Sequence, residues 1–436
     1  MPELILTQHH DVPNLDDIDV YIEHGGYRAW PTVLREMTEQ QVIDAVSRSG
    51  LRGRGGAYFP TGRKWALTVK DGGPNYLCCN ADEGEPGTFK DRQLMERNPH
   101  EVLEGCCIAA FANAAEWVYI YIRGEFFRAA AQLEKAIAQA YDRGYLGDRV
   151  LDTGRRMHIV VHRGAGAYIC GEETSLLSSL DGKRGYPRIK PPFPGQRGIV
   201  ERPSVVNNVE TLCNVPHIIN NGAEWFARIG TRRAPGTKIF SVSGHVEKPG
   251  NYERPLGTPL REIIYDCAGG IRDGKQLKTV LPGGSSTQFL PPEKLNTPTT
   301  PEDMLAAGSM LGSGAVIVMD EDTCIVNAAR ILAKFYMNES CGQCTPCREG
   351  CRWLFQILDR IEAGEGDPGD PDLILDICNG IATKSLCLLG DSITYPLVSS
   401  VQLFRDEYDR HIRERRCVPK ANGRQQRPRD ADNRRP

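Results

Sequence analysis

Three cysteines stand close together in the last third of the chain. The segment Ser340-Cys-Gly-Gln-Cys-Thr-Pro-Cys-Arg-Glu-Gly350 spaces Cys341, Cys344 and Cys347 as C-x2-C-x2-C. Thiolates at this spacing, on a tight loop that carries Gly and Pro, can each reach one corner of a cubic cluster, and the spacing opens the bacterial ferredoxin pattern. The segment therefore predicts an iron–sulfur cluster and, with it, electron transfer.

A fourth thiolate must come from elsewhere, and the predicted helices indicate which one. Apolar periodicity predicts helices over 322–338, 348–363, 371–381 and 393–411, and short connections between them predict an antiparallel bundle. In such a bundle the first and third connections lie at the same end. The first holds the triplet and the third holds Cys387, which is therefore the favoured fourth ligand. Cys351 and Cys378 are the alternatives, and zinc is the alternative metal, although zinc sites usually use two separated Cys/His pairs.

A glycine-rich segment, 50–65, is a second candidate site. Its glycines let the backbone approach a ligand, its consecutive N–H groups can form an anion nest, and Arg54 and Lys64 add positive charge. We therefore expect a bound phosphate here, with a flexible basic loop as the alternative. The segment matches neither a Walker A loop nor G-x-G-x-x-G.

Two polar, acidic segments, 80–87 and 163–174, each follow a predicted strand. Ligands of open α/β sheets bind beyond the carboxyl ends of the strands, so both segments are expected to line one crevice. Their carboxylates would accept hydrogen bonds from ribose or ribityl hydroxyls. Capping of helix N-termini is the alternative role for these Asp and Glu residues.

The elements that position these groups follow from periodicity. Strands are predicted at 75–80, 117–122 and 157–162, with a helix over 127–143, and this βαβ order indicates a mostly parallel sheet. His158 and His162 share one face of the third strand and are interpreted as structural. From about residue 235 the pattern changes to a hairpin, a short helix at 259–268 and a strand at 277–281, which predicts a small α+β module. Residues 413–436 are predicted to form a disordered basic tail.

Length and composition set the wider frame. A chain of 436 residues with 40% hydrophobic and 25% charged residues and a net charge of −3 suggests two or three domains and favours neither nucleic acid nor an anionic membrane as partner. No segment approaches the roughly 20 apolar residues that span a bilayer. The first residues do not resemble a secretory signal, so the 15 cysteines are expected to be reduced and disulfides explain them poorly.

Taken together, five motifs resemble one family. They are Gly-Leu-Arg-Gly-Arg-Gly-Gly-Ala-Tyr-Phe-Pro-Thr-Gly from Gly50, Asn-Ala-Asp-Glu-Gly-Glu-Pro-Gly from Asn80, Gly-Ala-Gly-Ala-Tyr-Ile-Cys-Gly-Glu-Glu-Thr from Gly164, Val206-Asn-Asn-Val-Glu-Thr-Leu212 and the cysteine segment. In this order they resemble the flavoprotein subunit of respiratory complex I over roughly residues 20–412. The resemblance implies an α/β Rossmann-like FMN- and NADH-binding domain (1–234), a ubiquitin-like α+β domain (235–321) and a four-helix bundle with a [4Fe–4S] cluster (322–412).

The resemblance also implies contacts residue by residue. Those to FMN are Gly53, Arg54, Gly55, Gly56, Lys64, Asn80, Asp82, Glu83, Gly171, Glu172, Glu173, Asn207, Asn208 and Thr211, the last three near the phosphate. Those to NADH are Phe59, Lys64, Glu83, Glu85, Glu173 and Phe193, of which the aromatic pair offers π faces to the rings. The chain departs from the family at Tyr58, where glycine is usual, and at Leu67, where an aromatic residue is frequent. A larger side chain at 58 is expected to crowd the crevice, and Leu67 to weaken one side of the adenine stack.

The implied reaction is hydride transfer from nicotinamide C4 to flavin N5, followed by single-electron transfer to the cluster, with no side chain as nucleophile or general acid. The implied partners are a thioredoxin-like [2Fe–2S] subunit and a large iron–sulfur subunit. The implied location of this chain is the cytoplasmic side of a bacterial inner membrane, without insertion into it.

A diaphorase subunit of a soluble NAD-linked hydrogenase or formate dehydrogenase is one alternative. The short leader and the lack of a further Cys-rich segment favour complex I over it. A non-catalytic zinc-bundle protein is the other.

Overall fold

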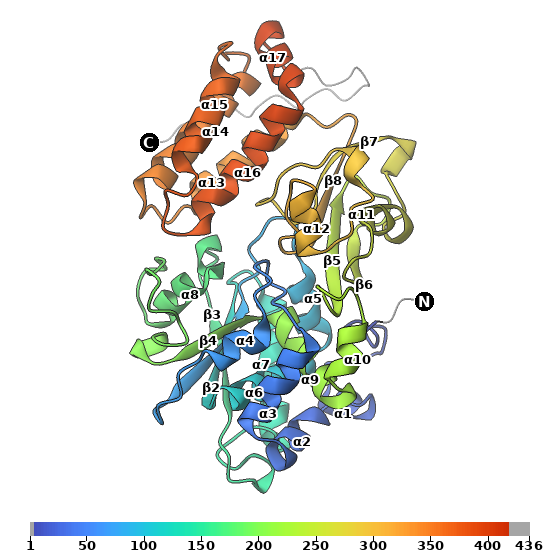
Figure 1. Cartoon of the computed structure of the whole chain (residues 1–436), viewed down its shortest axis with the longest axis vertical. Coiled ribbons are helices and arrows are strands. Elements are labelled where there is room, and N and C mark those ends of the chain that lie inside the picture. Colours follow the sequence, from blue (N-terminus) through green and yellow to red (C-terminus); the bar gives the residue numbers. More distant parts are fainter. Residues whose placement is uncertain (1–3, 418–436) are drawn as a thin grey trace.

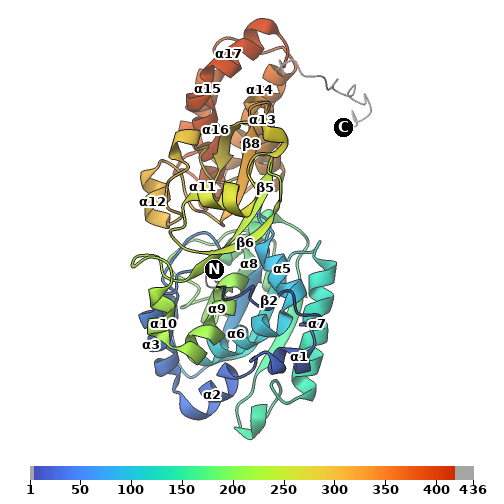
Figure 2. The same cartoon turned by 90° about the vertical axis from the view of Figure 1, so that its right-hand side faces the viewer.

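The computed structural model describes residues 4–417, which form two sheets and a group of C-terminal helices. In both views the first sheet and its helices occupy the lower half, and the second sheet and the C-terminal helices share the upper half (Figures 1 and 2). The predicted domain limits stay predictions. The elements of each part fall inside them, except that the last helix ends at Glu414, beyond residue 412. Residues 418–436 of the predicted tail lie outside the described residues.

The first sheet is entirely parallel, in the order β3-β2-β1-β4. Its strands are β1 (Asn75–Ala81), β2 (Ala115–Ile122), β3 (His158–Arg163) and β4 (Ser204–Asn208). The first three confirm the predicted strands, while β4 was seen in the sequence only as part of a motif. Pairing of β4 with β1 brings Asn207 and Asn208 beside Cys79 and Asn80, at the carboxyl ends of both strands.

The side-chain alternation of β1 explains how the sheet is covered. Leu77 and Cys79 belong to the core formed with helices α6 (Pro99–Ala112), α7 (Phe127–Asp142) and α9 (Val209–Asn221), whereas Cys78 belongs to a core shared with α8 (Glu173–Leu180) and the C-terminal helices. One face of the sheet is therefore a conventional α/β core, and the other face packs toward the helical bundle. The remaining helices of this part are α1 (Ile18–Glu23), α2 (Ala29–Glu36), α3 (Glu39–Ser49), α4 (Thr61–Ala66), α5 (Lys90–Arg97) and α10 (Ala223–Arg228).

The two strand histidines have structural surroundings, as predicted. The His158 ring stacks on Trp117 with the centroids 4.6 Å apart, and the His162 ring stacks on Tyr121 at 5.2 Å. Tyr141 also contacts His158 Nδ1 at 3.0 Å. These aromatic neighbours account for both imidazoles without a metal ion.

The second sheet has the order β6-β5-β8-β7. The strands β5 (Thr237–Gly244) and β6 (Gly250–Pro255) form the predicted hairpin, β7 (Leu277–Leu281) is the predicted strand, and β8 (Ala315–Asp320) pairs parallel to β5. Helices α11 (Leu260–Glu262), extended by a π-helical turn to Cys267, and α12 (Pro301–Ala306) accompany the sheet.

The C-terminal part is a four-helix bundle with one added helix. Helices α13 (Ile325–Glu339), α14 (Thr345–Glu362), α15 (Asp370–Ile381) and α16 (Leu388–Leu403) each pack on their neighbours, and α13 also packs on α16. The prediction of one helix over 393–411 is wrong, because the chain leaves helical geometry at Phe404, where α17 (Arg405–Glu414) begins. At this break the Phe404 ring packs edge-on against Phe289 of the second part. No helix within residues 4–417 is long and apolar enough to cross a membrane.

Candidate functional site

A cavity of about 420 Å³ is lined by residues from all three parts of the chain. That volume lies in the range of small-molecule and cofactor sites. The glycine-rich loop, the carboxyl end of β1 and the turn before α8 supply one wall, the loops of the second part supply another, and the start of α16 closes the third. Members of these walls include Gly55, Gly56, Asn80, Asp82, Glu83, Glu85, Lys90, Asp91, Tyr168, Gly171, Glu172, Asn208, Ser286, Gly312, Ser313, Cys387 and Tyr395.

Two buried polar atoms of this cavity lack a hydrogen-bond partner among the described residues. They are Oδ2 of Asp82 and Oδ1 of Asn208. Burial raises the pKa of Asp82 to about 7. Unpaired buried polar atoms are unfavourable by about 1–3 kcal/mol each, so both atoms suit a ligand that brings hydroxyl or amide donors. A ribityl or ribose chain has such donors, and the lining therefore fits a flavin nucleotide.

The glycines of the cavity leave room that a side chain would fill. A Cβ on Gly55 would lie 3.1 Å from the Asn208 Cβ, and one on Gly171 would lie 3.4 Å from the Asp82 carbonyl oxygen. Gly56 has φ +125°, which L-residues rarely adopt. These positions therefore bring the main chain itself against whatever occupies the cavity, as expected of the glycine-rich segment.

Two of the predicted acidic residues also cap helices, which was the alternative role. The Glu83 carboxylate accepts the N–H groups of Asp91 at 2.8 Å and Arg92 at 3.0 Å, at the start of α5. The Glu172 carboxylate accepts the N–H groups of Thr174 and Ser175, both at 2.9 Å, at the start of α8. Burial, reinforced by the Asp91 charge, raises the pKa of Glu83 to about 7. Both residues thus combine a capping role with a place in the cavity wall.

Glu173 lies between two lysines and follows Glu172 of the cavity wall. Its carboxylate is 2.8 Å from Lys64 Nζ and 2.7 Å from Lys190 Nζ. Although burial opposes ionisation, these two ammonium groups lower the pKa of Glu173 to about 2. Phe59 and Phe193, predicted to face NADH, are 44% and 55% exposed. Neither these two rings nor Lys64 and Glu173 belong to the cavity wall.

The glycine-rich loop is tied down by Arg54, whose side chain does not line the cavity. The guanidinium is fully buried and donates to the carbonyls of Pro235 at 2.7 Å, Thr237 at 3.0 Å and Arg52 at 3.0 Å. Its positive charge is thereby directed to the domain junction and not to a phosphate. The Arg54 N–H donates to Thr211 Oγ1 at 2.8 Å, so Thr211 supports the loop from behind.

The other predicted residues outside the wall have similar supporting contacts. Asn207 Oδ1 accepts the Trp65 indole N–H at 2.8 Å, and the Gly53 N–H donates to the Phe59 carbonyl at 2.9 Å. In the wall itself, the Asn80 amide donates to the Gly171 carbonyl at 2.8 Å. These bonds join the loop, β1 and the α8 turn into one frame.

Sequence reasoning missed a buried ionic group at the cavity. Lys90 Nζ lies 2.7 Å from Asp91 and 2.8 Å from Glu210, and the Asn208 amide donates to Asp91 at 2.6 Å. Lys90 is only 1% exposed. Lys90-Asp91 carries no motif, and the only signal was its position shortly after a strand end. Tyr168 was also missed: its hydroxyl donates to Glu85 at 2.6 Å and holds that carboxylate in place.

The four predicted cysteine ligands line one pocket. Cys341, Cys344, Cys347 and Cys387 surround it together with Ile169, Pro187, Ser340, Ser385 and Leu389. The Leu386 N–H donates to Cys344 Sγ at 3.3 Å. Cys351 Sγ lies 4.0 Å from Cys347 Sγ but is buried among the helices, as is Cys378, and neither lines the pocket. Four thiols facing one small space form a donor set that fits a cubane cluster.

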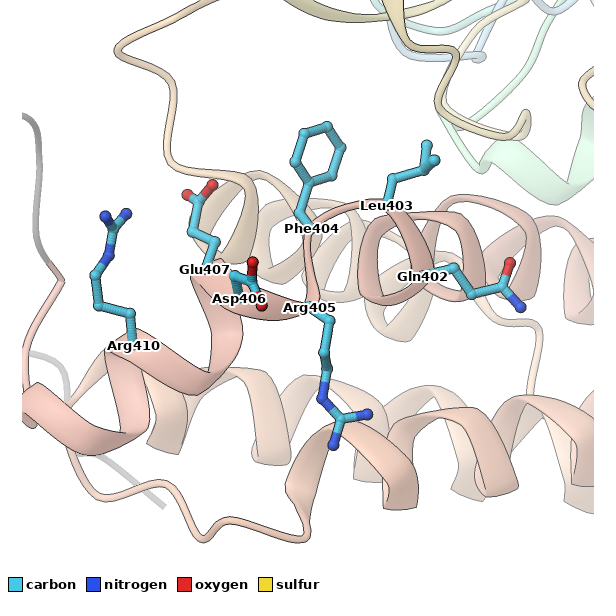
Figure 3. Close-up of a pocket in the computed structure, with 7 residues that line it drawn as sticks. All are labelled: Gln402, Leu403, Phe404, Arg405, Asp406, Glu407 and Arg410. Carbon is cyan, nitrogen blue, oxygen red and sulfur yellow. The ribbon is translucent and has the colours of Figure 1, made fainter.

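A hollow of about 460 Å³ lies at the junction of α16 and α17 (Figure 3). Its Arg405 is paired with Asp372 at 2.7 Å, and its Glu407 with Lys278 at 2.7 Å. Both of these charges are therefore paired within the protein, whereas Nε of Arg410, which also lines the hollow, has no hydrogen-bond partner among the described residues.

Comparison with known families agrees with this geometry. Residues 46–217 match the Nuo51 FMN-binding domain, residues 327–411 match the NADH-ubiquinone oxidoreductase-F iron-sulfur binding region, and residues 239–290 match the SLBB domain. The first match covers the part of the cavity wall formed by the first sheet and its loops, the second covers the four cysteines, and the third covers β5, β6 and β7 of the second sheet. Fold and site thus define a flavin- and iron–sulfur-dependent electron-transfer protein.

Individual relatives identify the family. The NADH-quinone oxidoreductase F subunit numbered 2 in Rhizobium meliloti (strain 1021) is 50% identical over 418 residues, 96% of this chain and 99% of that protein. The F subunit of Streptomyces coelicolor is 49% identical over 95% of this chain and 92% of that protein. A solved NAD⁺-reducing [NiFe]-hydrogenase is 34% identical with a TM-score of 0.83, over 94% of this chain and 67% of that chain. The chain belongs to the family of NADH-quinone oxidoreductase F subunits.

Proposed function

We propose that this chain is the electron-input subunit of an NADH:quinone oxidoreductase, which oxidises NADH and delivers electrons to a [4Fe–4S] cluster. The observation that carries the proposal is a shared wall: Ile169, Cys387 and Leu389 line both the large cavity and the cysteine pocket. A redox group in the cavity would therefore stand directly beside one in the pocket. Bound FMN supplies a hydride acceptor that can release the two electrons singly.

The residues of the chain hold and orient these groups. In the proposed site, the FMN-binding residues are Gly53, Arg54 through its main chain, Gly55, Gly56, Lys64, Asn80, Asp82, Glu83, Gly171, Glu172, Glu173, Asn207, Asn208 and Thr211. Of these, Gly55, Gly56, Asn80, Asp82, Glu83, Gly171, Glu172 and Asn208 line the cavity. Cys341, Cys344, Cys347 and Cys387 would hold the cluster, and the remaining FMN residues support the wall.

The proposed NADH-binding residues lie in the wall and at the rim. Glu83 and Glu85 belong to the wall, while Phe59, Lys64, Glu173 and Phe193 do not. Exposed aromatic rings at the rim offer faces on which a nicotinamide or adenine ring can stack. The carboxylates place negative charge where the pyrophosphate of the substrate enters, which would limit the affinity for NAD⁺ and so speed its release.

The relatives carry the name of one subunit of an oxidoreductase, which implies a multi-subunit complex. We place this chain at the cytoplasmic face of a bacterial inner membrane as a peripheral subunit. A thioredoxin-like [2Fe–2S] subunit and a large iron–sulfur subunit are its proposed neighbours and the next carriers of its electrons.

A diaphorase role in an NAD-linked hydrogenase is the second candidate, because the solved hydrogenase shares the fold. Identity favours the first candidate: the Rhizobium relative is 50% identical across 99% of its length, against 34% across 67% for the hydrogenase chain.

Anaerobic purification of the full chain with its co-expressed neighbours tests the proposal. We expect about one FMN per copy of this chain and about four irons per copy beyond those of the neighbours' clusters, rapid NADH:ferricyanide reduction, and NADH-dependent reduction of a quinone by the assembled complex. A colourless protein without flavin would contradict the proposal. Hydrogen-dependent reduction of NAD⁺ without quinone reduction would replace it with the diaphorase role.

A further inference from the structure

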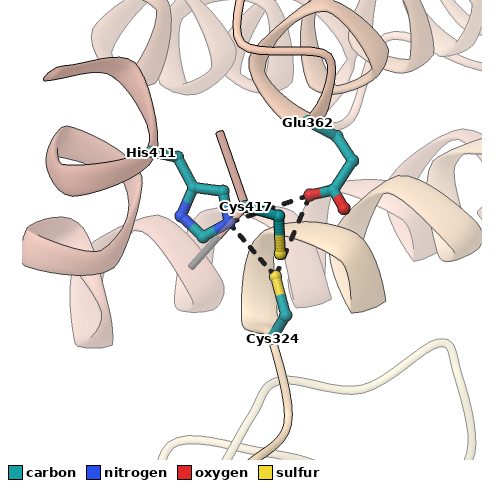
Figure 4. A group of neighbouring side chains, drawn as sticks. All are labelled: Cys324, Glu362, His411 and Cys417. Atoms are coloured by element: carbon teal, nitrogen blue, oxygen red, sulfur yellow. Dashed lines mark hydrogen bonds and ion pairs between the residues drawn. The ribbon is translucent and has the colours of Figure 1, made fainter. Parts of the chain in front are cut away.

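A second group of metal-ligand side chains lies at the other end of the bundle. Cys324, Glu362, His411 and Cys417 point toward one another, and their four ligand atoms all lie within 4.8 Å of one another (Figure 4). Cys324 precedes the first turn of α13, whereas Cys341 follows the last. The 15-residue helix between them is about 22 Å long, so this group is separate from the cysteine pocket.

The spacing of the four atoms suits a tetrahedral ion. Cys324 Sγ lies 3.3 Å from His411 Nε2 and 3.9 Å from Glu362 Oε2, and these last two atoms are 3.8 Å apart. Zinc–ligand distances of about 2.0–2.3 Å in a tetrahedron set ligand separations of roughly 3.3–3.8 Å. Cys324, Glu362 and His411 therefore need shifts of only a few tenths of an ångström to bind one ion, and Cys417 Sγ lies within 4.8 Å of each of their ligand atoms.

The hydrogen bonds of the group already orient its ligands. His411 Nδ1 lies 2.8 Å from the Glu407 carbonyl oxygen, which can only accept, so Nδ1 carries the proton and Nε2 presents its lone pair to the group. Cys324 Sγ accepts the Asn327 N–H at 3.3 Å, an interaction that favours the thiolate. A carbonyl that fixes the tautomer of a histidine is the usual support of a zinc ligand.

We propose that Cys324, Glu362, His411 and Cys417 bind a structural zinc ion. Two thiolates, an imidazole and a carboxylate are the ligand types that zinc takes, and four protein ligands leave no open position for catalysis. Binding releases the two thiol protons to solvent. The set has too few thiolates for a Cys-ligated iron–sulfur cluster.

The site would join elements that are distant in sequence. Cys324 lies at the start of α13, Glu362 is the last residue of α14, His411 is on α17, and Cys417 lies beyond α17. The break at Phe404 leaves α17 as a separate helix, so one ion would fix its end to the first two bundle helices. The proposed zinc thus holds the far end of the bundle while the iron–sulfur cluster holds the near end.

Zinc and iron contents of the complete chain, purified anaerobically with a chelator wash, test the site. We expect about one zinc per chain in the wild type and only a trace in Cys324→Ser and Cys417→Ser. The matched control Cys267→Ser changes a half-buried cysteine of the second part and should keep its zinc. Cys417 lies past the last helix, so its variant should still fold, and unchanged iron and FMN contents would show that it does.

Zinc K-edge X-ray absorption of the wild type tests the ligand set without any variant. We expect two sulfur ligands at about 2.3 Å and two nitrogen or oxygen ligands at about 2.0–2.2 Å. Four sulfur ligands would place the zinc in the cysteine pocket and overturn the proposal. It would equally be overturned by a protein that takes up no zinc when supplied with it, by full zinc in both serine variants, or by a Cys324–Cys417 disulfide in peptide mass spectra of the purified protein.

Discussion

The Lys238 ammonium lies 2.5 Å from the Glu210 carboxylate, and both side chains are completely buried. Glu210 belongs to α9 beneath the first sheet and Lys238 to β5 of the second, so the pair joins the two parts. Lys90, in the cavity wall, reaches the same carboxylate at 2.8 Å. Burial lowers the pKa of Lys238 to about 7, although Glu210 opposes the shift. The Glu210 carboxylate thus contacts two lysines directly behind the proposed flavin site, and Asp91 pairs with Lys90 as well.

Removal of the Glu210 carboxylate should lower the free energy of unfolding. Glu210→Gln leaves Lys90 and Lys238 with one nearby counter-charge, Asp91, and removing one partner of a buried pair costs about 3–5 kcal/mol. We expect a loss of this size in urea unfolding of the chain. The double variant Glu210→Gln/Lys238→Met removes the surplus charge and should recover part of the loss.

The surface pair of Lys135 and Asp16, at 2.7 Å, gives the matched control. Lys135 is 49% exposed, and solvent screening limits such pairs to less than about 1 kcal/mol. Asp16→Asn should therefore leave unfolding nearly unchanged. Equal effects of Glu210→Gln and Asp16→Asn would show that the buried network does not stabilise the domain junction.

Tyr58 offers a stabilising substitution. Its side chain is buried in the apolar core of the second part, with φ 52°, and its hydroxyl has no hydrogen-bond partner among the described residues. The ring points into this core and is absent from the cavity wall, so the expected crowding of the crevice does not arise there. Tyr58→Phe should raise the free energy of unfolding by about 1 kcal/mol, because it removes an unpaired buried hydroxyl.

Thermal unfolding and the KM for NADH check Tyr58→Phe together. We expect a higher Tm with an unchanged KM. A lower Tm would mean that the hydroxyl has a partner, and a changed KM would mean that Tyr58 reaches the substrate after all.

Cys387 and Cys351 should respond differently to replacement. Both lie near the cysteine triplet, but only Cys387 lines its pocket. Cys387→Ala should lose most of the cluster iron and its EPR signal while FMN stays bound. Cys351→Ala, which removes a sulfur 4.0 Å from Cys347 Sγ, should keep its cluster iron and show only a core-packing loss of stability. The reverse pattern would make Cys351 the fourth ligand.

The sequence predicted what local patterns encode. Strands β1 to β3 and helix α7 have strong periodicity, and the cysteine loop places three ligands within seven residues. The break at Phe404 was not predicted, because the helical pattern runs on through it, and the ring that Phe404 contacts, Phe289, lies more than a hundred residues earlier. Strand β8 was missed as well, since its pairing partners β5 and β7 come from distant segments.

The same limit applies to the site. Motifs located part of the cavity wall, because glycines and carboxylates after a strand are local signals. They did not predict the hydrogen bonds of the Arg54 side chain, whose acceptors Pro235 and Thr237 lie about 180 residues away. Lys90 gave only the weak signal of its position after a strand end, and Tyr168, although it lies within the segment 163–174, was not singled out. Long-range contacts decide which charges face a ligand, and composition within a motif does not reveal them.

Glu83 should control how strongly NAD⁺ inhibits the enzyme. With a pKa raised to about 7 by burial, this carboxyl is largely ionised at pH 8 and largely neutral at pH 6. Ionised, it repels the pyrophosphate of NAD⁺, and protonation removes that repulsion. The inhibition constant for NAD⁺ should therefore fall as the pH falls from 8 to 6. One screened charge is worth about 1 kcal/mol, or roughly a fivefold change.

The Glu83→Gln variant carries no charge at position 83 and should therefore resemble, at every pH, the wild type with Glu83 protonated. We expect its NAD⁺ inhibition constant at pH 8 to be about fivefold below that of the wild type, since the repulsion is absent at every pH. Any pH dependence of the NAD⁺ inhibition constant that remains in the variant would come from Asp82, whose pKa is also raised to about 7 by burial. Glu134→Gln, which neutralises an exposed carboxylate on α7, should behave like the wild type. The glutamine side chain retains one of the two oxygens that accept the α5 N–H groups, so it can keep one of the two capping bonds, and FMN content, measured alongside, should stay constant. Unchanged inhibition at pH 8 with FMN fully bound would mean that this carboxylate does not act on product release.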